Sequence, residues 1–313
     1  MRKALHRVRR AATEMAIRQA IAVSGTLPDR FSRSAVRSLV ALGGASPVLR
    51  RRVRQNMQLA LGRDVSAEVV RDYFHHAAWF YSNALSTFHR GLAASAVPDD
   101  FVFDDSVRVL DEAVAEGRGV VFISPHWSGH ELLAAMVARR HPMTMLVRQA
   151  PTPERTARKL KWYGALGAEI VLRPRQASSI KDAVVYLKVL KQGKLFAITP
   201  DLLADPGQGV EARLFGRAVR LHAGAFALAI SAQVPMIRAS IRWQSGSSVL
   251  GILERAPWPP DSGNRDAAVR AAVQEWCRWF EAKLQADPEN WLFWLDKRWT
   301  HFLRTTPRMA DAE

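Results

Sequence analysis

The sequence predicts an α/β fold, in which a mostly parallel central sheet is flanked by helices and preceded by an N-terminal helical region. Two observations lead to this prediction. From about residue 101 onward, apolar strand-like segments alternate with helical segments, whereas strand signals are nearly absent before residue 95. Such alternation is typical of a parallel sheet covered on both faces. We therefore expect a helical region over 1–95 and an α/β region over 96–313.

Length and composition indicate a globular protein. The chain has 313 residues, of which 48% are hydrophobic and 24% charged, and these proportions exclude a disordered protein. The single cysteine, Cys277, excludes an internal disulfide framework and fits a reducing compartment. We expect Cys277 to serve packing rather than chemistry.

The expected elements follow one another in a simple order. In the first region we expect a basic first helix, a second helix after Pro28, and helices over 48–61 and 65–89. The expected strands lie at FVF near 101, VVFIS at 120, TMLVR at 144, AEIVL at 168, LFAIT at 195 and PMIRASIRW at 235. The helices between them are expected over 129–140, 153–165, 177–192 and 222–232.

The net charge of +16 is concentrated near the N-terminus. Residues 1–63 contain fourteen Arg or Lys against two acidic residues. In the first helix Leu5, Val8, Ala12 and Met15 share one face, with basic residues broadly opposite. This pattern is typical of a basic amphipathic helix on an anionic membrane surface. A helix that packs on the domain and a nucleic-acid-binding arm are the alternatives.

No segment is expected to span a bilayer. The longest uncharged stretch, 221–237, contains His222, Gln233 and Pro235, and it reads as a buried helix that leads into a strand. Peripheral attachment is therefore expected. Six of the ten tryptophans lie after residue 257, interleaved with cations. This arrangement is typical both of a membrane-interface surface and of helix packing, and we expect packing for about half of these tryptophans.

The run GVVFISPHWSGHE places a histidine at the end of an apolar strand and a glutamate five residues later. Five residues along one helix leave side chains about 140° apart, so His126 must lie in the turn and Glu131 in the helix that follows. The carboxylate of Glu131 is then expected to reach back to the imidazole and form a general-base pair. The alternative is that Ser128 and Glu131 form a capping box. The spacing of His126 and His130 matches no standard zinc motif, and we expect no metal.

Polar residues also follow two other predicted strands. Arg148 comes directly after TMLV, and Asp201 comes directly after FAITP. Ligands of open α/β sheets bind at the carboxyl ends of strands. If these strands are neighbours, a base, a cation and an acid converge on one cleft.

These segments together resemble the lysophospholipid acyltransferase superfamily, and within it the late acyltransferases of lipid A biosynthesis. HWSGHE looks like the family's H-x-x-x-x-D/E motif, and RRVRQNMQLALG is similar to its upstream Arg- and Asn-containing block. Three later blocks also match in order, namely VRQAPTPERTARKLKWYGALGAEIV, TPDLLADPGQGVEARLFGRAVRLHAGAFALAISAQVPMI and DPENWLFWLDKRW. The resemblance thus runs over nearly the whole length.

The resemblance implies an acyltransferase with His126 as base and Glu131 as its partner. It implies substrate contacts by Arg148 and Asp201, with Asn56 and Arg298 as weaker carry-overs. The implied reaction moves a fatty acyl chain from acyl carrier protein or CoA to a hydroxyl of a glycolipid such as a lipid A precursor, without a cofactor.

The implied location is the cytoplasmic face of the inner membrane, held peripherally on an anionic surface. Departures from the family keep other acceptors open. Leu202 and Leu203 follow Asp201 where the lipid A branch commonly has Gln-Asp. A mannosylated phosphoinositide or another glycolipid is therefore the alternative acceptor. A basic nucleic-acid-binding protein is the alternative from another class, and we expect no nucleic acid as partner.

Overall fold

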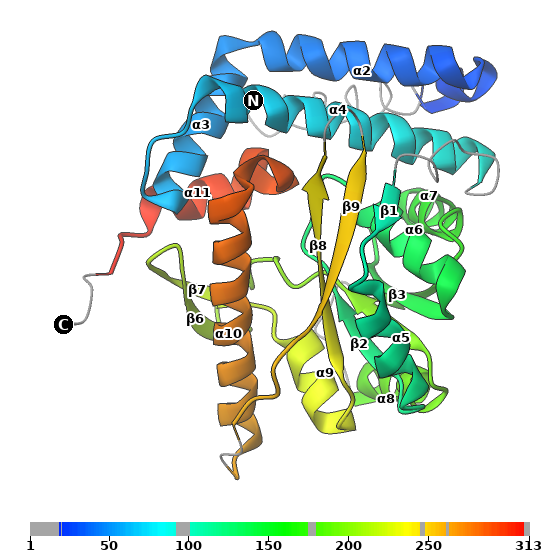
Figure 1. Cartoon of the computed structure of the whole chain (residues 1–313), viewed down its shortest axis with the longest axis vertical. Coiled ribbons are helices and arrows are strands. Elements are labelled where there is room, and N and C mark those ends of the chain that lie inside the picture. The colour runs from blue at the N-terminus through cyan, green and yellow to red at the C-terminus, as the bar shows by residue number, and fades with distance from the viewer. Residues whose placement is uncertain are drawn as a thin grey trace.

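The computed structural model describes residues 19, 21–91, 101–174, 180–244, 248–260 and 263–309. The expected basic helix at the N-terminus lies outside these residues. Figure 1 shows a central sheet with helices on both faces and a layer of N-terminal helices across one end. The predicted fold class is therefore confirmed.

Three N-terminal helices form that end layer, close to the expected ranges. They are α2 (Asp29–Ala45), α3 (Pro47–Leu61) and α4 (Ala67–Arg90). α2 lies along α4 (Figure 1). Gly44 permits this close approach, because a Cβ there would lie 2.9 Å from the Cβ of Phe74. α4 begins where the Ser66 hydroxyl accepts a hydrogen bond from the Val69 N–H, a standard N-cap.

The central sheet has seven strands in the order β1-β9-β8-β2-β5-β3-β4. All neighbours are parallel except β8 and β9, which pair antiparallel. The strands are β1 (Phe101–Phe103), β2 (Val120–Ile123), β3 (Met143–Arg148), β4 (Glu169–Arg173), β5 (Leu195–Ile198), β8 (Met236–Trp243) and β9 (Val249–Arg255). The carboxyl ends of β8, β2, β5, β3 and β4 point toward α4, whereas β9 and β1 run the opposite way (Figure 1). The six expected strands are thus all present.

Several elements were not anticipated. A separate hairpin consists of β6 (Val210–Leu214) and β7 (Arg217–Leu221). Its two-residue turn has positive φ at both Phe215 (56°) and Gly216 (66°), as a type I′ turn requires. Strand β9 and the helices α5, α10 and α11 were not anticipated either.

The helices after residue 101 pack around the sheet, except the last one, which lies against α3 (Figure 1). They are α5 (Val107–Ala115), α6 (His130–Arg140), α7 (Pro153–Gly164), α8 (Ile180–Lys191), α9 (Gly224–Ala232), α10 (Arg265–Ala286) and α11 (Lys297–Thr305), with the 3₁₀ segments η3 (Pro288–Asn290) and η4 (Leu292–Leu295). The uncharged stretch over 221–237 forms α9 and the start of β8, as expected. Within the described residues, no helix is long and apolar enough to cross a membrane.

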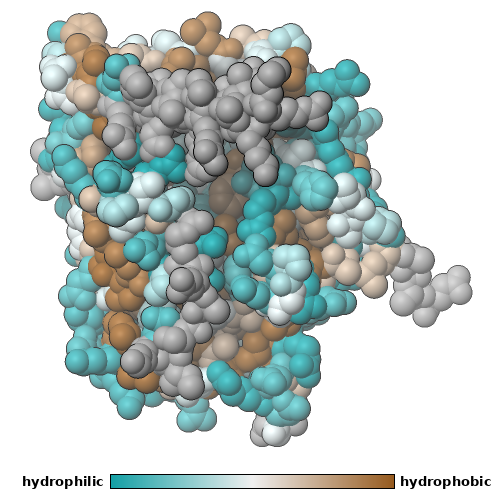
Figure 2. Space-filling view, turned by 180° about the vertical axis from the view of Figure 1, so that it is seen from behind, coloured by the Kyte–Doolittle hydropathy of each residue, from teal (hydrophilic) through white to brown (hydrophobic). Residues whose placement is uncertain are grey.

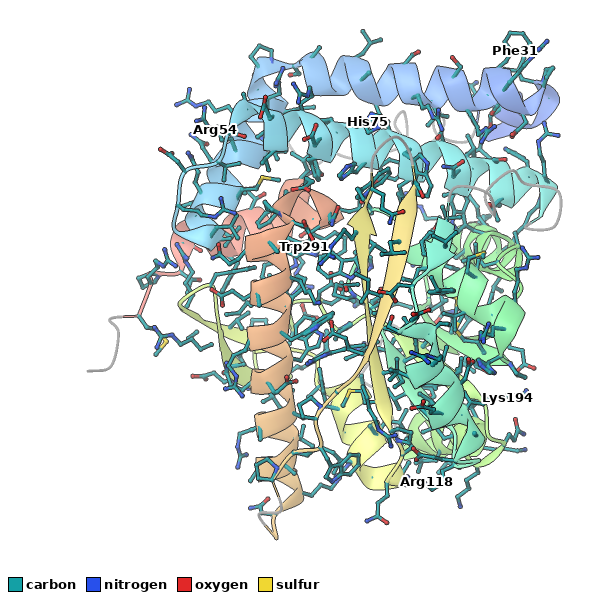
Figure 3. The ribbon with its side chains drawn as sticks, viewed as in Figure 1. Phe31, Arg54, His75, Arg118, Lys194 and Trp291 are labelled. Atoms are coloured by element: carbon teal, nitrogen blue, oxygen red, sulfur yellow. The ribbon has the colours of Figure 1, made fainter. Side chains whose placement is uncertain are left out.

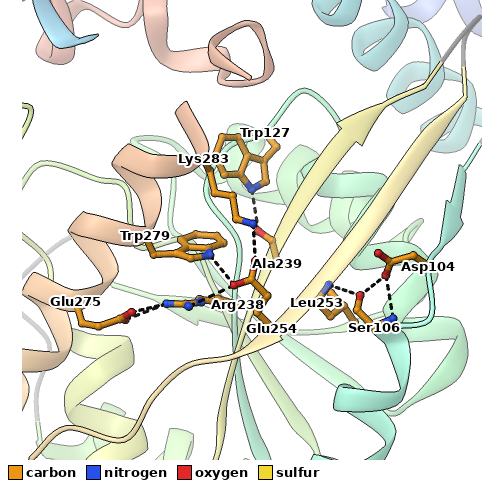
Figure 4. Close-up of polar contacts among 10 residues, drawn as sticks. All are labelled: Asp104, Ser106, Trp127, Arg238, Ala239, Leu253, Glu254, Glu275, Trp279 and Lys283. Atoms are coloured by element: carbon orange, nitrogen blue, oxygen red, sulfur yellow. Dashed lines mark hydrogen bonds and ion pairs between the residues drawn. The ribbon is translucent and has the colours of Figure 1, made fainter. Parts of the chain in front are cut away.

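An ion-pair network ties α10 to β8 and β9 (Figure 4). The guanidinium of Arg238 on β8 contacts the carboxylates of Glu275 (2.7 Å) and Glu254 (3.3 Å). Glu254 also accepts from Trp279 Nε1 (3.1 Å) and contacts Lys283 Nζ (2.5 Å). Because Arg238 is largely buried, these partners offset the cost of removing its charge from water.

The C-terminal tryptophans mostly pack in the core. Five of the six after residue 257 are buried, and only Trp258 is exposed. The expectation that about half would be buried was too low, because four of these rings pack against Phe215 or Phe280 in the core. Cys277 is buried and free, and burial raises the pKa of its thiol to about 12, which confirms the packing role.

Candidate active site

His126 lies in the loop between β2 and α6, and neighbouring segments fix this loop. Trp127 Nε1 donates to the carbonyl of Ala239 on β8 (2.8 Å; Figure 4). Ser128 N–H donates to the carbonyl of Asn290 (2.6 Å), and the His126 carbonyl accepts from Leu292 N–H (3.0 Å). The C-terminal η3–η4 segment therefore forms one wall of the loop that carries the histidine.

The imidazole of His126 pairs with Asp201, which follows β5. His126 Nδ1 lies 2.7 Å from Asp201 Oδ1, and the His126 backbone N–H donates to Asp201 Oδ2 (2.9 Å). β2 and β5 are adjacent parallel strands, so their carboxyl ends bring the two residues together. An ionised Asp201 accepts the Nδ1 proton, which leaves Nε2 unprotonated as a base. Phe293 stacks on the imidazole with 4.1 Å between ring centres.

Asp201 is fully buried but well satisfied by hydrogen bonds. Trp291 Nε1 donates to its Oδ2 (2.8 Å), and Trp299 Nε1 donates to its backbone carbonyl (3.1 Å). Burial alone would raise the pKa of Asp201. The neighbouring His126 and the hydrogen bonds from His126 and Trp291 outweigh this effect and hold the pKa below its ordinary value.

Glu131 occupies a different environment from the expected one. It lies in the first turn of α6, and its Oε2 accepts from Trp162 Nε1 on α7 (2.8 Å). The expectation that its carboxylate hydrogen-bonds His126 is wrong, because Asp201 holds Nδ1. The capping-box alternative is also wrong, since the N-cap is Gly129 with no side-chain cap. Burial raises the pKa of Glu131 to about 7, against the opposing effects of Trp162, His126 and Tyr163.

His130 is buried behind His126. Its Nδ1 lies 2.8 Å from the Trp127 carbonyl, and the two imidazole rings lie 4.9 Å apart. Burial and the nearby His126 lower the pKa of His130 to about 3, so it is neutral at ordinary pH. A neutral neighbour leaves His126 free to accept a proton without direct charge repulsion.

His126 opens on a cavity of about 310 Å³ at the carboxyl ends of β2, β5 and β3. Arg148 and Arg298, both expected site residues, line this cavity together with Lys159, Arg173 and His222. Arg298 also contacts Asp205 Oδ1 (3.0 Å). Burial lowers the pKa of His222, and the charges of Arg173, Arg148 and Arg298 lower it further. The cavity therefore carries a cationic wall suited to an anionic group.

A second cavity of about 360 Å³ adjoins the first and is mainly apolar. The second cavity extends between α8 and α9. The two cavities share six lining residues, namely Leu146, Arg173, Ile198, Thr199, Leu202 and His222. On the face seen in Figure 2, brown apolar surface is recessed between teal polar side chains near the centre of the molecule. An apolar cavity thus adjoins the cavity that His126 lines.

Asn56 and Arg173 both differ from the sequence-based expectations. Asn56 does not line either cavity; its Nδ2 donates to the carbonyl of Trp294 (2.7 Å) and to Thr300 Oγ1 (2.8 Å), so it joins α3 to the C-terminal segments. Arg173 was missed, although it ends a predicted strand just as Arg148 does. Arg173 on β4 lies opposite Arg148 on the neighbouring strand β3.

A model of the bacterial lipid A biosynthesis acyltransferase family matches residues 3–301 of the chain. The match spans every element that lines the two cavities. No curated protein matches the chain.

Proposed function

The chain belongs to the family of bacterial lipid A biosynthesis acyltransferases, and from this premise we propose the reaction and its machinery. The chain transfers a fatty acyl group from a thioester donor to a hydroxyl of a glycolipid, with His126 as general base. The observation that carries this proposal is the His126–Asp201 pair at the junction of a cationic cavity and an apolar one. This junction favours acyl transfer over the nucleic-acid-binding alternative.

The proton transfer follows from the hydrogen bonds of the pair. Asp201 holds the Nδ1 proton of His126, so Nε2 takes the proton of the acceptor hydroxyl. The hydroxyl oxygen then forms a bond to the thioester carbonyl carbon, and the C–S bond breaks as the thiolate leaves. His126 returns the proton to the sulfur. Asp201 stabilises the imidazolium that forms between these steps.

The developing negative charge on the thioester carbonyl needs donors. The backbone N–H groups of Ser124, His126, Trp127, Ser128 and His130 are already bonded to protein acceptors. Side-chain cations of the cavity wall are therefore the better candidates, and we assign this role to Arg148.

The adjoining apolar cavity suits the fatty acyl chain. Burial of methylene groups there is favourable, by about 0.8 kcal/mol for each CH₂ removed from water. The carbonyl end of such a chain would lie beside Leu202 and Ile198, where the two cavities meet. The thioester is carried by acyl carrier protein or CoA, both of which bring phosphate groups toward the cationic wall.

We assign membrane attachment to the end layer of N-terminal helices. The outer face of α2 exposes Phe31, Leu39 and Leu42, which are 53%, 67% and 71% exposed. Phe31 lies on this outer face in Figure 3, and brown side chains project along the same edge in Figure 2. An apolar stripe on a basic amphipathic helix is typical of attachment in the bilayer interface. The carboxyl ends of β2, β5 and β3 point toward this layer, so the acceptor lipid reaches the site from the membrane.

The test is acyl transfer by the purified chain, followed by mass spectrometry of the acceptor lipid. With a lipid A precursor and acyl carrier protein thioester, we expect a product heavier by one acyl group. His126→Ala should abolish the product, whereas His301→Ala, an exposed histidine on α11, should leave it unchanged. Full activity of a folded His126→Ala protein would rule out the assigned base. Parallel assays with acyl-CoA and with a mannosylated phosphoinositide identify the donor and the acceptor.

A further inference from the structure

A groove of about 530 Å³ lies between α2, α3 and α4, separate from the two cavities of the candidate active site. It shares no lining residue with either of them. In Figure 3, His75 on α4 marks this groove, close beneath α2. Close packing at Gly44 against Phe74 closes one part of the floor.

The rim of the groove is cationic and poorly neutralised. Arg37, Arg50 and Arg71 line it from three different helices. Arg37 donates to Ser82 Oγ (3.2 Å), and Arg71 contacts the neighbouring Asp72 at 3.4 Å. Neither Arg37 nor Arg50 has a carboxylate partner within the described residues. Guanidinium groups without a carboxylate partner favour a phosphate or carboxylate ligand.

The floor of the groove is apolar. Phe74, Ala78 and Trp79 are buried and line it from α4. Trp79 is only 2% exposed, and its indole N–H has no acceptor in the described part of the chain. Because this N–H is itself buried, the surface that the floor offers to a ligand is apolar, and the polar groups lie on the arginine rim.

The groove is continuous with the apolar stripe of α2. Ser38, Ala41 and Ala45 line the groove, and the exposed Leu39 and Leu42 are their immediate neighbours on the same helix. A molecule with an anionic head and a hydrocarbon tail could place its head on the arginine rim and its tail along the apolar floor.

We propose that this groove binds one anionic phospholipid of the bilayer, with its phosphate held by Arg37, Arg50 and Arg71. The proposal rests on the membrane attachment assigned to α2 above. Bound there, the lipid fixes the orientation of the end layer on the membrane, while the acceptor lipid uses the separate cavity at His126.

The first experiment measures sedimentation of the full chain with vesicles of phosphatidylcholine that contain or lack phosphatidylglycerol. Arg50→Gln with Arg71→Gln should weaken partition into the phosphatidylglycerol vesicles about 30-fold, from about 1 kcal/mol for each basic residue at an anionic surface. The matched control is Arg139→Gln with Arg270→Gln, two exposed arginines near the C-terminal end of α6 and the N-terminal end of α10, remote from α2 (Figure 1). The control should change partition less than twofold. Equal losses in both pairs would overturn the proposal, because net charge alone would then explain binding.

A second variant distinguishes a specific lipid site from nonspecific hydrophobic binding by the surface. Ala41→Trp fills the groove with an apolar ring, so it should abolish the one-to-one phosphatidylglycerol adduct in native mass spectrometry. If the groove is only an apolar surface without a specific lipid site, the added ring leaves that adduct intact or increases vesicle binding. Either result would contradict the proposal. Acyl transfer to acceptor dispersed in detergent should be unchanged in all these variants. Absence of acyl transfer by the wild-type chain would instead contradict the proposed function. Failure of the lipid-site proposal and failure of the proposed function are therefore distinguishable.

Discussion

Replacing Asp201 with asparagine should inactivate the enzyme without unfolding it, and the reason lies in which oxygen accepts which hydrogen bond. Oδ2 accepts from the His126 backbone N–H (2.9 Å) and from Trp291 Nε1 (2.8 Å), whereas Oδ1 faces His126 Nδ1 alone (2.7 Å). The asparagine carbonyl oxygen satisfies two donors at the Oδ2 position. Its amide NH₂ then faces Nδ1 and forces the proton onto Nε2. The imidazole can no longer accept the proton of the hydroxyl.

The expected size of this effect is large. A wrong histidine tautomer in a comparable acid–imidazole pair lowers kcat by roughly 10⁴-fold. We therefore expect Asp201→Asn to lower kcat by about 10³- to 10⁴-fold with KM changed little. The matched variant is Glu131→Gln, which keeps an acceptor for Trp162 Nε1 and should lower kcat less than tenfold.

The assay is initial-rate acyl transfer with circular dichroism to verify folding. A bell-shaped or sigmoidal pH–rate profile adds a second readout, because Asp201→Asn should remove the limb that reports ionisation of the base. If Glu131→Gln is the more severe of the two variants, Glu131 is the working partner of His126 and the reasoning from the hydrogen bonds is refuted.

Three further outcomes follow from the contacts described above. Glu131 has a pKa raised to about 7, so the folded state binds its proton more tightly than the unfolded state does, and the stability gained at low pH is lost as pH rises from about 4.5 through 7. Glu131→Gln should remove this pH dependence, which is on the order of 3 kcal/mol. Denaturant titrations at pH 5 and 8 measure the free energy of unfolding, and an equal change between the two pH values in both proteins would contradict the prediction. Trp291→Phe leaves Asp201 without one donor at full burial, so chemical denaturation should show a loss of about 1–3 kcal/mol together with a lower kcat, and an unchanged kcat would dissociate the indole from the pair. Ala227→Phe narrows the apolar cavity between α8 and α9, so competition between long and short acyl donors should move toward the short ones, and an unchanged preference would place the acyl chain elsewhere.

Much of the site could be predicted from the strand ends alone. β2, β5 and β3 are successive neighbours in the sheet, so His126, Asp201 and Arg148 come to one edge as expected. The same rule would have found Arg173 at the end of β4. Alternation of apolar segments was sufficient for the central strands because β2 and β5 are almost entirely buried.

The partner of His126 could not be predicted because it depends on long-range packing. Local spacing brings Glu131 near the histidine, but Trp162 on α7 and burial in the first turn of α6 determine where its carboxyl group points. No local pattern indicates that α7 lies there. Asp201 is 75 residues away in sequence and reaches the imidazole only through strand pairing.

The apolar end of the chain was equally hard to interpret from sequence. Trp291 and Trp299 read as either membrane-interface or packing residues, and both in fact donate to Asp201. Asn56 resembled a substrate contact, yet it holds Trp294 and Thr300. These roles depend on contacts that the last third of the sequence makes with residues far earlier in the chain.

The hydrogen bonds from Trp291 and Trp299 to Asp201 also affect when the enzyme becomes competent during synthesis. The ribosome makes His126 and Asp201 long before these indoles emerge, so an unfinished chain holds its acid with fewer donors and in a looser geometry. If the pair acts as proposed, a nascent chain therefore lacks the complete site until α11 docks and Trp299 donates to the Asp201 carbonyl.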